Sequence, residues 1–481
     1  MSAPSASSAQ GRRPDRRAGA PGAGKAPEEM TLVVGPPAHG GHCVARPQGE
    51  PNGRVVFVRH ALPGETVRAR ITAQTSKMWR ADAIEVLTAS PDRVEPVWPE
   101  AGPGGVGGGE LSHVALPAQR TWKRWVLADC LRRIGGPEVA DAVRALPSST
   151  PPGGVPVEPM PSEAAAEASE DPQTRALAGT GTRTRIELAI GEGGAPGMHV
   201  FRSAEILPVR DLPLAVPAIR DLGLTTRDSW RACLARARHV EAVAPSASAP
   251  VVIVDGKVLS AAGRPMSRQR VDESVDASGL GLGELRYAVR ADAFWQIHRD
   301  APRVLVEAVA RGALGDEAAA PGAAGAERRG GPRVLELYSG SGLLTLPLAL
   351  LAGEVISLEG SERAVRDADR NLRPAPSARL MAGRVTAASV AELGRSFGLG
   401  RDQGADVVVL DPPRQGAGKD VVEAIVEVGP ERVVLVACDP AALARDLGSL
   451  LRGGYRLEGL RALDMFPHTH HFETIAVLHR S

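Results

Sequence analysis

From Arg333 to the end of the sequence, short apolar runs alternate with longer stretches of helical pattern. The apolar runs are Val334–Leu337, Glu354–Leu358, Ala405–Leu410, Arg432–Ala437 and Phe472–His479. This alternation is typical of a doubly wound α/β sheet, in which ligands bind beyond the carboxyl ends of the strands. We therefore predict a Rossmann-like α/β domain over residues 291–481, with its functional site at that edge of the sheet.

The first ninety residues have a different pattern. Strand-like runs over 31–34, 54–58, 65–71 and 79–87 are separated by turn residues such as Pro51-Asn52-Gly53. Short strands spaced this closely predict a small β-barrel of the oligonucleotide-binding (OB) type over residues 30–90. Residues 1–28 are rich in Ala, Ser, Pro, Gly and Arg, and we predict a disordered tail there.

Between these parts, residues 91–290 mix helical and strand-like patterns and are predicted to form an α+β central domain. Residues 118–145 have the periodicity of an amphipathic helix, which we expect to pack on the C-terminal domain. A second helix is expected around 229–240. Residues 147–182 are of low complexity and are expected to be a loose insert, and an Ala/Gly-rich linker covers roughly 313–331.

The charge of the chain is nearly balanced, because 57 Lys and Arg residues against 56 Asp and Glu residues give a formal net charge of +1. No global basic field therefore favours a polyanion, and any nucleic-acid surface must be a local patch. No apolar run reaches the roughly eighteen residues of a membrane helix, so no membrane span is predicted.

Cysteine usage indicates the compartment. Cys43, Cys130, Cys233 and Cys438 are scattered without Cys-Xaa-Xaa-Cys spacing, which argues against a disulfide framework and against a cysteine-only zinc site. We therefore expect a cytoplasmic protein. Nothing in the sequence demands an oligomer, and a monomer is expected.

A glycine-rich turn, Glu336-Leu337-Tyr338-Ser339-Gly340-Ser341-Gly342, follows the first predicted strand and precedes a predicted helix over 343–351. Glycines at such a place let the backbone approach a ligand closely. Glu359 ends the next strand about twenty residues later, where a carboxylate can bond ribose hydroxyls. These features indicate a nucleotide-type cofactor, with an ordinary tight turn as the alternative. Because no Gly-Lys-Ser/Thr follows, the turn is not a phosphate-binding P-loop.

Cys438 ends the apolar run Val433–Ala437. A buried structural cysteine is the usual interpretation of such a residue. However, Asp439-Pro440 places the thiol at the ligand edge, and a helix predicted over 441–451 begins there. Because a helix N-terminus lowers the pKa of a thiol, we predict that Cys438 is a nucleophile able to attack an electron-poor ring.

Two carboxylates accompany this thiol in the sequence. Asp411 follows a strand in Asp411-Pro412-Pro413-Arg414, where the prolines stiffen the loop and hold the carboxylate outward. Glu473 follows the turn His468-Thr469-His470-His471. A surface glutamate and a metal site shared with these histidines are the alternatives, but the ligand spacing is poor and no metal is predicted. We interpret Glu473 as a general base.

Taken in order, these motifs resemble those of the bacterial RNA uracil-5-methyltransferases, which make 5-methyluridine in ribosomal or transfer RNA. The resemblance covers residues 30–480. The segments that carry it are Phe294-Trp295-Gln296, the glycine turn at 336–342, Asp411–Arg414, Cys438–Ala441 followed by Leu443-Ala444-Arg445-Asp446, and Pro467–Glu473. The predicted barrel looks like the family's TRAM domain, a small RNA-binding barrel.

This resemblance implies a class I methyltransferase fold that uses S-adenosylmethionine. It implies that Cys438 is the nucleophile and Glu473 the general base. The residues that it places against S-adenosylmethionine are Gln296, Tyr338, Gly340, Glu359 and Asp411. The thiolate would add to carbon 6 of a uridine in RNA, which makes carbon 5 nucleophilic enough to take the methyl group. Glu473 would then remove the proton on carbon 5, and the thiol would be eliminated.

The sequence departs from the family in several places. Many members that act on ribosomal RNA hold an iron–sulfur cluster through four cysteines, and no cluster is predicted here, because the positions carry other residues. The residues at those positions are Trp98, Val106, Gly109 and Leu212. Ser339 and Leu343 stand where Cys and Asn are common in the glycine turn, and His298 replaces a usual Asn.

The rival interpretation is an RNA-binding TRAM protein with an inactive methyltransferase fold. Because degenerate enzymes usually lose the nucleophile or the base, the presence of Cys438 and Glu473 favours the enzyme. Methylation of cytosine carbon 5 is a lesser alternative, since those enzymes usually carry a Pro-Cys motif that is missing before Cys438. Arg414 and Arg445 are candidate contacts of RNA phosphate. The choice between ribosomal and transfer RNA stays open.

Overall fold

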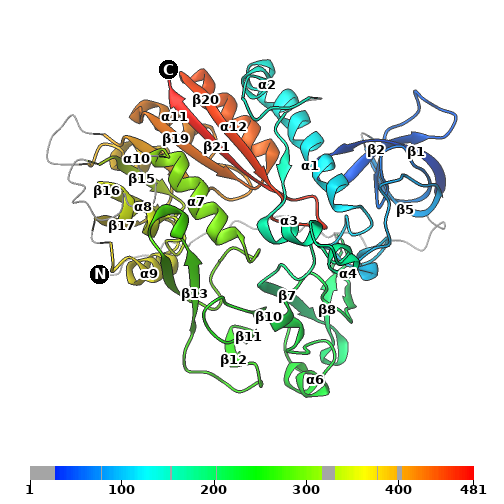
Figure 1. Ribbon diagram of the computed structural model, residues 1–481. Helices are drawn as coiled ribbons and strands as arrows, with labels where there is room; N and C mark the ends of the chain where they lie inside the picture. Colours follow the sequence, from blue (N-terminus) through cyan, green and yellow to red (C-terminus); the bar gives the residue numbers. More distant parts are fainter. Residues whose placement is uncertain are drawn as a thin grey trace, which may run out of the picture.

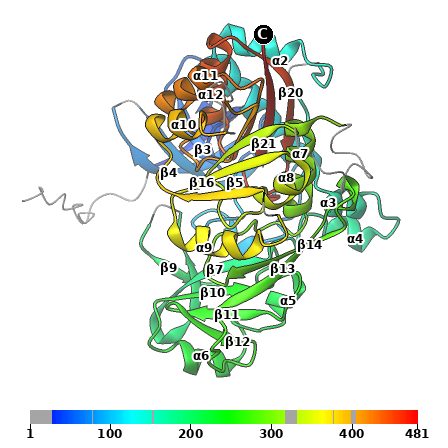
Figure 2. The same cartoon turned by 90° about the vertical axis from the view of Figure 1, so that its left-hand side faces the viewer.

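The computed structural model describes residues 28–76, 78–151, 154–201, 203–316, 331–375, 377–397 and 404–481. Figure 1 shows a barrel (blue), a sheet at the lower end (green) and a larger sheet at the upper end (yellow to red). The view in Figure 2 keeps the green sheet and the larger sheet at opposite ends of the molecule. The tail predicted over 1–28 lies, up to residue 27, outside the described residues, and so does most of the predicted linker 313–331.

The first part of the chain forms a closed barrel with strand order β1-β2-β3-β5-β4, which confirms the predicted barrel. The strands are β1 (Glu29–Ala38), β2 (His42–Pro47), β3 (Val56–Arg59), β4 (Thr66–Gln74) and β5 (Trp79–Thr88). Leu32, Val58 and Val67 point inward and are completely buried. The sequence pattern misses β2, because its inward residues, Cys43 and Ala45, are small and give little periodic signal.

The central region forms an antiparallel sheet with strand order β12-β11-β10-β7-β8-β9. Its strands are β7 (Arg185–Ile190), β8 (Pro196–His199), β9 (Ile206–Pro208), β10 (His239–Val243), β11 (Val251–Val254) and β12 (Lys257–Ser260). The helix predicted around 229–240 is shorter than expected, since α6 spans Asp228–Leu234. The residues after it form β10, in which Val240 and Ala242 are buried with the period of two that a strand requires.

The larger sheet has the strand order β17-β16-β15-β18-β19-β21-β20-β6. Its strands are β6 (Val157–Glu158), β15 (Arg333–Leu337), β16 (Glu354–Glu359), β17 (Ala378–Ala382), β18 (Val407–Leu410), β19 (Arg432–Ala437), β20 (Tyr455–Leu463) and β21 (Glu473–Arg480). Strands β15 to β19 pair in parallel, and β21 runs antiparallel to β19 and β20. The doubly wound α/β prediction is confirmed, although β17 and β20 were not predicted.

Helices connect and cover these strands. They are α7 (Ala301–Leu314), α8 (Thr345–Leu351), α9 (Glu362–Asn371), α10 (Ala387–Leu393), α11 (Lys419–Val428) and α12 (Pro440–Arg452). A two-stranded ribbon, β13 (Arg270–Asp276) and β14 (Glu284–Arg290), is bound to α9 through Asp367. The Arg270 guanidinium donates to one carboxylate oxygen of Asp367 at 2.8 Å, and the Arg290 backbone N–H donates to the other at 2.9 Å. The central region is thereby tied to the larger sheet.

The helix predicted over 118–145 is interrupted. It consists of α1 (Leu116–Cys130), a π-helical turn over Leu131–Gly135 and α2 (Pro137–Arg144). The break falls at Gly136, whose φ of 90° suits glycine, and at Pro137, which lacks an N–H. Residues of α1 and α12 share one buried apolar cluster, so α1 packs on the larger sheet's side of the molecule. No helix in the described ranges has the length and apolar character needed to cross a membrane.

The prediction of a loose insert over 147–182 is wrong. Helices α3 (Pro161–Glu167) and α4 (Pro172–Ala176) occur there, and β6 pairs in parallel with β20 at the edge of the larger sheet. Met160 is completely buried. Low-complexity composition conceals this order, because a few buried contacts at well-placed positions hold the segment.

Candidate active site

A cavity of about 960 Å³ opens at the carboxyl ends of the parallel strands of the larger sheet, a size that suits a ligand of a few dozen atoms. The residues singled out from the sequence that line it are Gln296, Tyr338, Gly340, Glu359, Asp411, Cys438 and Glu473. They come from segments that are far apart in the chain, so the fold, and not local sequence, brings them together.

The glycine turn after β15 forms one wall of this cavity. Tyr338 has a φ of 65° and Gly340 a φ of 55°, and such values are uncommon for residues other than glycine. The Gly340 N–H donates to Glu359 Oε2 at 2.9 Å, and the Ser361 N–H donates to Oε1 at 2.7 Å. A side chain at Gly340 would meet no atom within 4 Å, so the turn presents bare backbone to open space.

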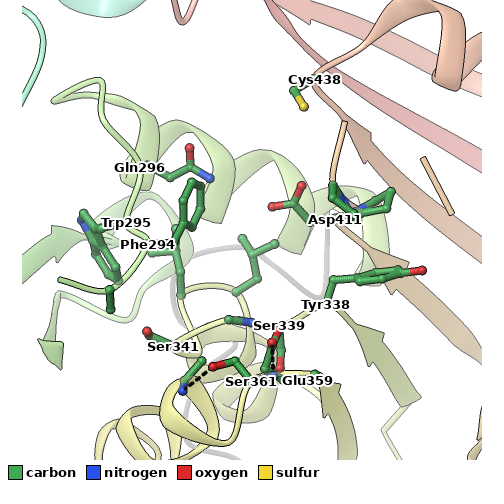
Figure 3. A pocket seen from close by; sticks show the side chains of 18 of the residues that line it. Phe294, Trp295, Gln296, Tyr338, Ser339, Ser341, Glu359, Ser361, Asp411 and Cys438 are labelled. Atoms are coloured by element: carbon green, nitrogen blue, oxygen red, sulfur yellow. Dashed lines mark hydrogen bonds between the residues drawn. The ribbon is translucent and has the colours of Figure 1, made fainter. Parts of the chain in front are cut away.

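Figure 3 shows how the side chains divide the cavity into two ends. Glu359 and Ser361 lie at one end and Cys438 at the other, while Gln296 and Asp411 face one another nearer to Cys438. The ring of Tyr338 extends away from Gln296. Each carboxylate oxygen of Glu359 accepts one backbone bond and keeps a lone pair for a further donor, such as a ligand hydroxyl.

The backbone on both sides of Cys438 is held in place. The Ala437 carbonyl accepts a hydrogen bond from Thr474 Oγ1 at 2.7 Å. On the other side, Asp439 is the N-cap of α12 and accepts from two backbone N–H groups of the first turn at 2.9 Å each. The thiol is therefore fixed between a strand end and a helix cap.

The thiol of Cys438 is less acidic than the sequence predicts. Burial raises the pKa of Cys438 to about 12, and the negative charges of Glu473 and Asp411 add to that shift, while Arg414 opposes it. The prediction of a lowered pKa is wrong because burial, with the carboxylates adding to it, outweighs the effect of the helix N-terminus. Without ligands, the residue is a protonated thiol at neutral pH.

Asp411, which is half-buried, and Glu473, which is buried, are carboxyl groups that interact electrostatically. Burial raises the pKa of Asp411 to about 6. Burial, followed by the charge on Asp411, raises the pKa of Glu473 well above its usual range. Only 5% of Glu473 is exposed, and its Oε1 has no hydrogen-bond partner within the described parts of the chain. Because burial and the neighbouring charge both disfavour the ionised form of Glu473, that form is a stronger base than an ordinary glutamate.

A third carboxyl group, Glu336, was not singled out as a site residue. It lies on β15, lines the cavity and is 1% exposed. Burial raises the pKa of Glu336 to about 8, against the opposite effect of the Thr345 hydroxyl. The signal in the sequence was a lone acidic residue inside the apolar strand Arg333–Leu337. A cation in the cavity would stabilise the ionised forms of these carboxyl groups.

The segment Phe294-Trp295-Gln296 closes the cavity from the side of α7. Trp295 is buried and packs against Tyr287, with ring centroids 5.3 Å apart. Phe294, in contrast, is 76% exposed although it lines the cavity. Figure 3 shows its ring beside Gln296, inside the pocket. A solvent-exposed aromatic face at this place is suited to stacking against a flat ring.

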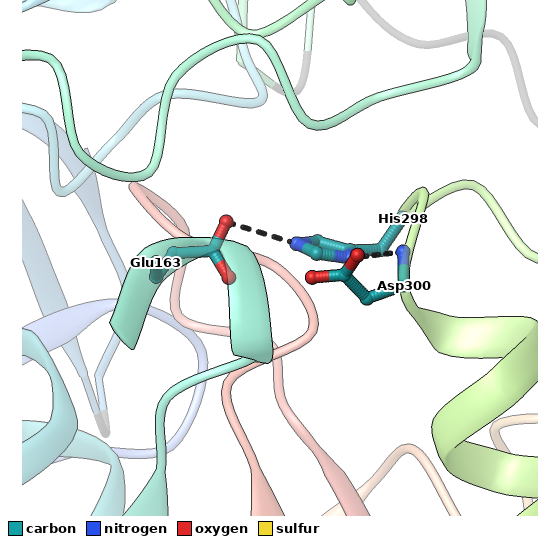
Figure 4. A group of neighbouring side chains, drawn as sticks. All are labelled: Glu163, His298 and Asp300. Atoms are coloured by element: carbon teal, nitrogen blue, oxygen red, sulfur yellow. Dashed lines mark hydrogen bonds and ion pairs between the residues drawn. The ribbon is translucent and has the colours of Figure 1, made fainter. Parts of the chain in front are cut away.

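His298, two residues after Gln296, belongs to a hydrogen-bonded cluster with Glu163 and Asp300 (Figure 4). This cluster, called the clasp below, joins helix α3 of the insert to the start of α7. The Asp300 backbone N–H donates to His298 Nδ1 at 3.1 Å, so the ring proton lies on Nε2, which donates to Glu163 Oε1 at 3.1 Å. The Ser162 N–H donates to the Asp300 carboxylate at 2.8 Å. In this tautomer Nε2 offers a proton and not a lone pair, so the cluster is a hydrogen-bonded clasp.

The histidine turn before Glu473 is fixed by residues of the central region. His468 Nδ1 lies 3.2 Å from Gln119 Nε2, and the His468 N–H donates to Gln119 Oε1 at 2.7 Å. The ring of His470 is hydrogen-bonded to Glu110, and this bond holds the pKa of Glu110 below its usual range against the opposite effect of burial. The rings of His468 and His470 are thus bound to protein groups. Sequence reasoning missed Gln119 and Glu110, which carry no motif.

The four positions where many relatives carry cluster cysteines lie in or beside an apolar cluster. Trp98, Val106 and Leu212 are buried in it. A Cβ added to Gly109 would lie 2.6 Å from a ring carbon of Trp98, so the indole fills the space at that position. These side chains offer no ligand for iron.

The two arginines proposed from the sequence differ in their surroundings. Arg414 is exposed at the rim of the cavity. Arg445 donates to Asp446 Oδ1 at 3.2 Å and to the Gln415 carbonyl at 2.5 Å. Arg445 therefore supports the loop after Asp411, and Arg414 is the better placed of the two to meet a ligand.

Comparisons with known proteins show which family the chain resembles. The family described as tRNA (Uracil-5-)-methyltransferase matches residues 323–481, and the TRAM domain matches residues 28–84. A protein of Streptomyces avermitilis named "Uncharacterized RNA methyltransferase" is 38% identical, with 94% of this chain and 98% of the relative covered. The 23S rRNA (uracil(1939)-C(5))-methyltransferase RlmD of Alkalilimnicola ehrlichii is 31% identical over 89% of this chain and 92% of its own length.

Among solved structures, the Pyrococcus abyssi tRNA (uracil-54, C5)-methyltransferase, crystallised with S-adenosyl-L-homocysteine, aligns with a TM-score of 0.60. The alignment covers 93% of this chain and 99% of that protein at 21% identity, which shows a shared fold. The relatives with 30% identity or more match nearly the whole chain, including both the barrel and the larger sheet. The chain belongs to the family of RNA uracil-5-methyltransferases that carry an N-terminal TRAM domain.

Proposed function

We propose that this enzyme transfers a methyl group from S-adenosylmethionine to carbon 5 of a uridine in RNA through a covalent adduct with Cys438. The observation that carries the proposal is that Cys438, Asp411 and Glu473 line the same cavity as the glycine turn and Glu359. A thiol and a buried base at one end, and a cofactor wall at the other, are the arrangement that this chemistry requires.

The cofactor-binding residues have distinct roles in this proposal. The residues assigned to S-adenosylmethionine are Gln296, Tyr338, Gly340, Glu359 and Asp411. Glu359 accepts from the ribose hydroxyls at its end of the cavity. The half-buried Asp411 and the buried Glu336 carry carboxyl groups whose ionised forms a cation would stabilise, and S-adenosylmethionine carries a positive sulfonium. Binding of this cation also offsets the negative charge that makes the Cys438 thiol weakly acidic.

The proposed reaction begins at Cys438. The Cys438 thiol would lose its proton to solvent water, and the thiolate sulfur would form a bond to carbon 6 of the uracil, which moves the electron pair of the 5,6 double bond into an enolate. Carbon 5 then attacks the sulfonium methyl, and S-adenosylhomocysteine leaves. Glu473 takes the proton from carbon 5, the carbon–sulfur bond breaks, and the double bond returns with Cys438 released.

The substrate is proposed to be ribosomal or transfer RNA, bound by a monomer in the cytoplasm. Arg414 at the rim would contact a phosphate, and Phe294 would stack against a base. On the barrel, the Arg54 guanidinium lies over the ring of Trp79 at 5.0 Å from its centroid, a surface suited to unpaired nucleotides.

A methyl-transfer assay tests the proposal. Purified full-length protein would be incubated with labelled S-adenosylmethionine and undermethylated ribosomal or transfer RNA, followed by nucleoside mass spectrometry. The expected product is 5-methyluridine with the wild type and none with Cys438→Ala. Glu473→Gln should accumulate a protein–RNA adduct that survives denaturing gels, because the carbon-5 proton is no longer removed. RNA binding without methyl transfer by the folded wild type would favour the inactive RNA-binding alternative.

A further inference from the structure

The turn between β1 and β2 of the barrel reaches the active site of the larger sheet. His39 Nε2 lies 2.9 Å from Asp439 Oδ2. The other carboxylate oxygen of Asp439 accepts the N–H groups of Ala441 and Ala442 in the first turn of α12. Asp439 therefore holds the start of the helix with one oxygen and the barrel with the other, and it is the residue directly after Cys438.

The same barrel turn also touches the segment that leads to Glu473. Gly41 has a φ of 77°, and a Cβ added there would lie 3.0 Å from His470 Nδ1. The ring of His470 is in turn hydrogen-bonded to Glu110. A turn of only three residues thus contacts both chain segments that carry the reactive groups.

We propose that the barrel takes part in positioning the reactive groups, with His39 as a positioning residue that fixes Cys438 through Asp439. This inference rests on the proposed function of Cys438. The expected role of a TRAM barrel is RNA binding. Here the barrel would also contribute to the chemical step. The reason is geometric, since Ala437 is held by Thr474 on one side of the thiol and Asp439 is held by His39 on the other.

The chemistry of the pair supports this role. The hydrogen bond to Asp439 raises the pKa of His39, which favours the charged imidazolium and a stronger bond to the carboxylate. The His39 side chain is 46% exposed and that of Asp439 is 25% exposed. Such a pair adds little to global stability, so its removal should leave the fold intact and act locally on the cap.

The test uses the full-length protein and two substitutions of one residue. His39→Ala removes the bond, whereas His39→Gln keeps an N–H donor that can reach Asp439. We expect His39→Ala to lower kcat about fivefold, with the KM for RNA and for S-adenosylmethionine unchanged, and His39→Gln to restore most of the loss. His239→Ala is the matched control, because His239 forms a similar partly exposed pair, 3.0 Å from Glu187, in the central sheet. That control should behave like the wild type.

A second readout does not depend on RNA. The rate at which iodoacetamide alkylates Cys438 should change at least about twofold in His39→Ala, since a loosened cap alters access to the thiol. Wild-type protein that makes no 5-methyluridine would reject the proposed function, while the alkylation rates would still test the positioning. If His39→Ala has the same kcat and the same alkylation rate as the wild type, the inference is overturned. A raised KM for RNA with unchanged kcat would also overturn it, by making His39 an RNA contact.

Discussion

Thr474 Oγ1 donates a hydrogen bond of 2.7 Å to the carbonyl of Ala437. These two residues are also direct neighbours across the antiparallel strands β19 and β21. Ala437 precedes Cys438 and Thr474 follows Glu473, so one side-chain bond and one strand pairing set the distance between the proposed nucleophile and the proposed base. The antiparallel β21, which lies between β19 and β20 in the sheet, therefore fixes the position of the proposed base relative to that of the proposed nucleophile.

Thr474→Val tests this relationship. Valine has the shape of threonine without the hydroxyl, so the buried Ala437 carbonyl loses a donor, which costs roughly 1–3 kcal/mol. We expect a lower midpoint in urea unfolding and a kcat reduced about tenfold, because small displacements of reacting groups are costly. Thr474→Ser keeps the hydroxyl and should retain most of the activity. If the valine and serine variants have equal kcat, this hydrogen bond does not contribute to catalysis.

The reactivity of Cys438 should depend on the carboxylates beside it. Because its pKa is about 12 in the free enzyme, iodoacetamide should label the exposed Cys233 faster at pH 8. Asp411→Asn removes one of the charges that raise the pKa of the thiol, so more thiolate forms at a given pH and Cys438 should be labelled several-fold faster. Peptide mass spectrometry over a time course measures both rates. Labelling of Cys438 that is unaffected by Asp411→Asn would contradict this account.

Much of the site could be predicted from the sequence, because its residues lie at strand ends. In a doubly wound sheet the carboxyl ends of parallel strands share one edge, so Glu359, Asp411 and Cys438 had to lie near one another once the strands were recognised. The sequence could not predict the pKa of Cys438 correctly. That value depends on burial and on two carboxylates whose distance to the thiol is set by tertiary structure.

Pairs of residues that lie far apart in the sequence were not recognised, for the same reason. His298 and Glu163 are separated by 135 residues and His39 and Asp439 by 400, and no local pattern links such pairs. The ordered insert over 147–182 was missed because Met160 and the short β6 are held by contacts with other parts of the chain and not by periodicity. β17 and β20 also escaped prediction, since their burial patterns are irregular.

Glu336 should make stability depend on pH. Its carboxyl group stays protonated in the folded chain up to a pKa of about 8, whereas the ordinary value is 4.5. Between these values the folded state binds more protons than the unfolded state, so stability falls as pH rises. Glu336→Gln removes this dependence. The difference in unfolding free energy between the wild type and Glu336→Gln should therefore change by on the order of 3 kcal/mol as the pH rises through this interval. Thermal melts of both proteins from pH 5 to 8 measure it; parallel curves would refute the shift.

The clasp in Figure 4 should support the cofactor wall. Glu163→Ala leaves the buried Nε2–H of His298 without an acceptor, which costs about 1–3 kcal/mol and should lower Tm by a few degrees. Because His298 is two residues from Gln296, we also expect a raised KM for S-adenosylmethionine. Glu163→Gln keeps an acceptor for that N–H, so its Tm and its KM for S-adenosylmethionine should be close to those of the wild type. Calorimetric titration of S-adenosylmethionine checks the effect, and identical affinity in all three proteins would limit the clasp to a structural role.

We expect Phe294 to contribute to RNA binding and not to the stability of the fold. Its side chain is 76% exposed at the cavity, so Phe294→Ala removes almost no buried surface and Tm should stay the same. If the ring stacks on a base, its loss costs roughly 1–3 kcal/mol per base, which corresponds to a fall in kcat/KM for RNA of about tenfold or more. Phe294→Tyr keeps the aromatic face and should preserve activity. The comparison needs kcat/KM for RNA at saturating S-adenosylmethionine, together with the affinity for S-adenosylmethionine alone. A loss of cofactor affinity with unchanged use of RNA would place the ring against the cofactor instead.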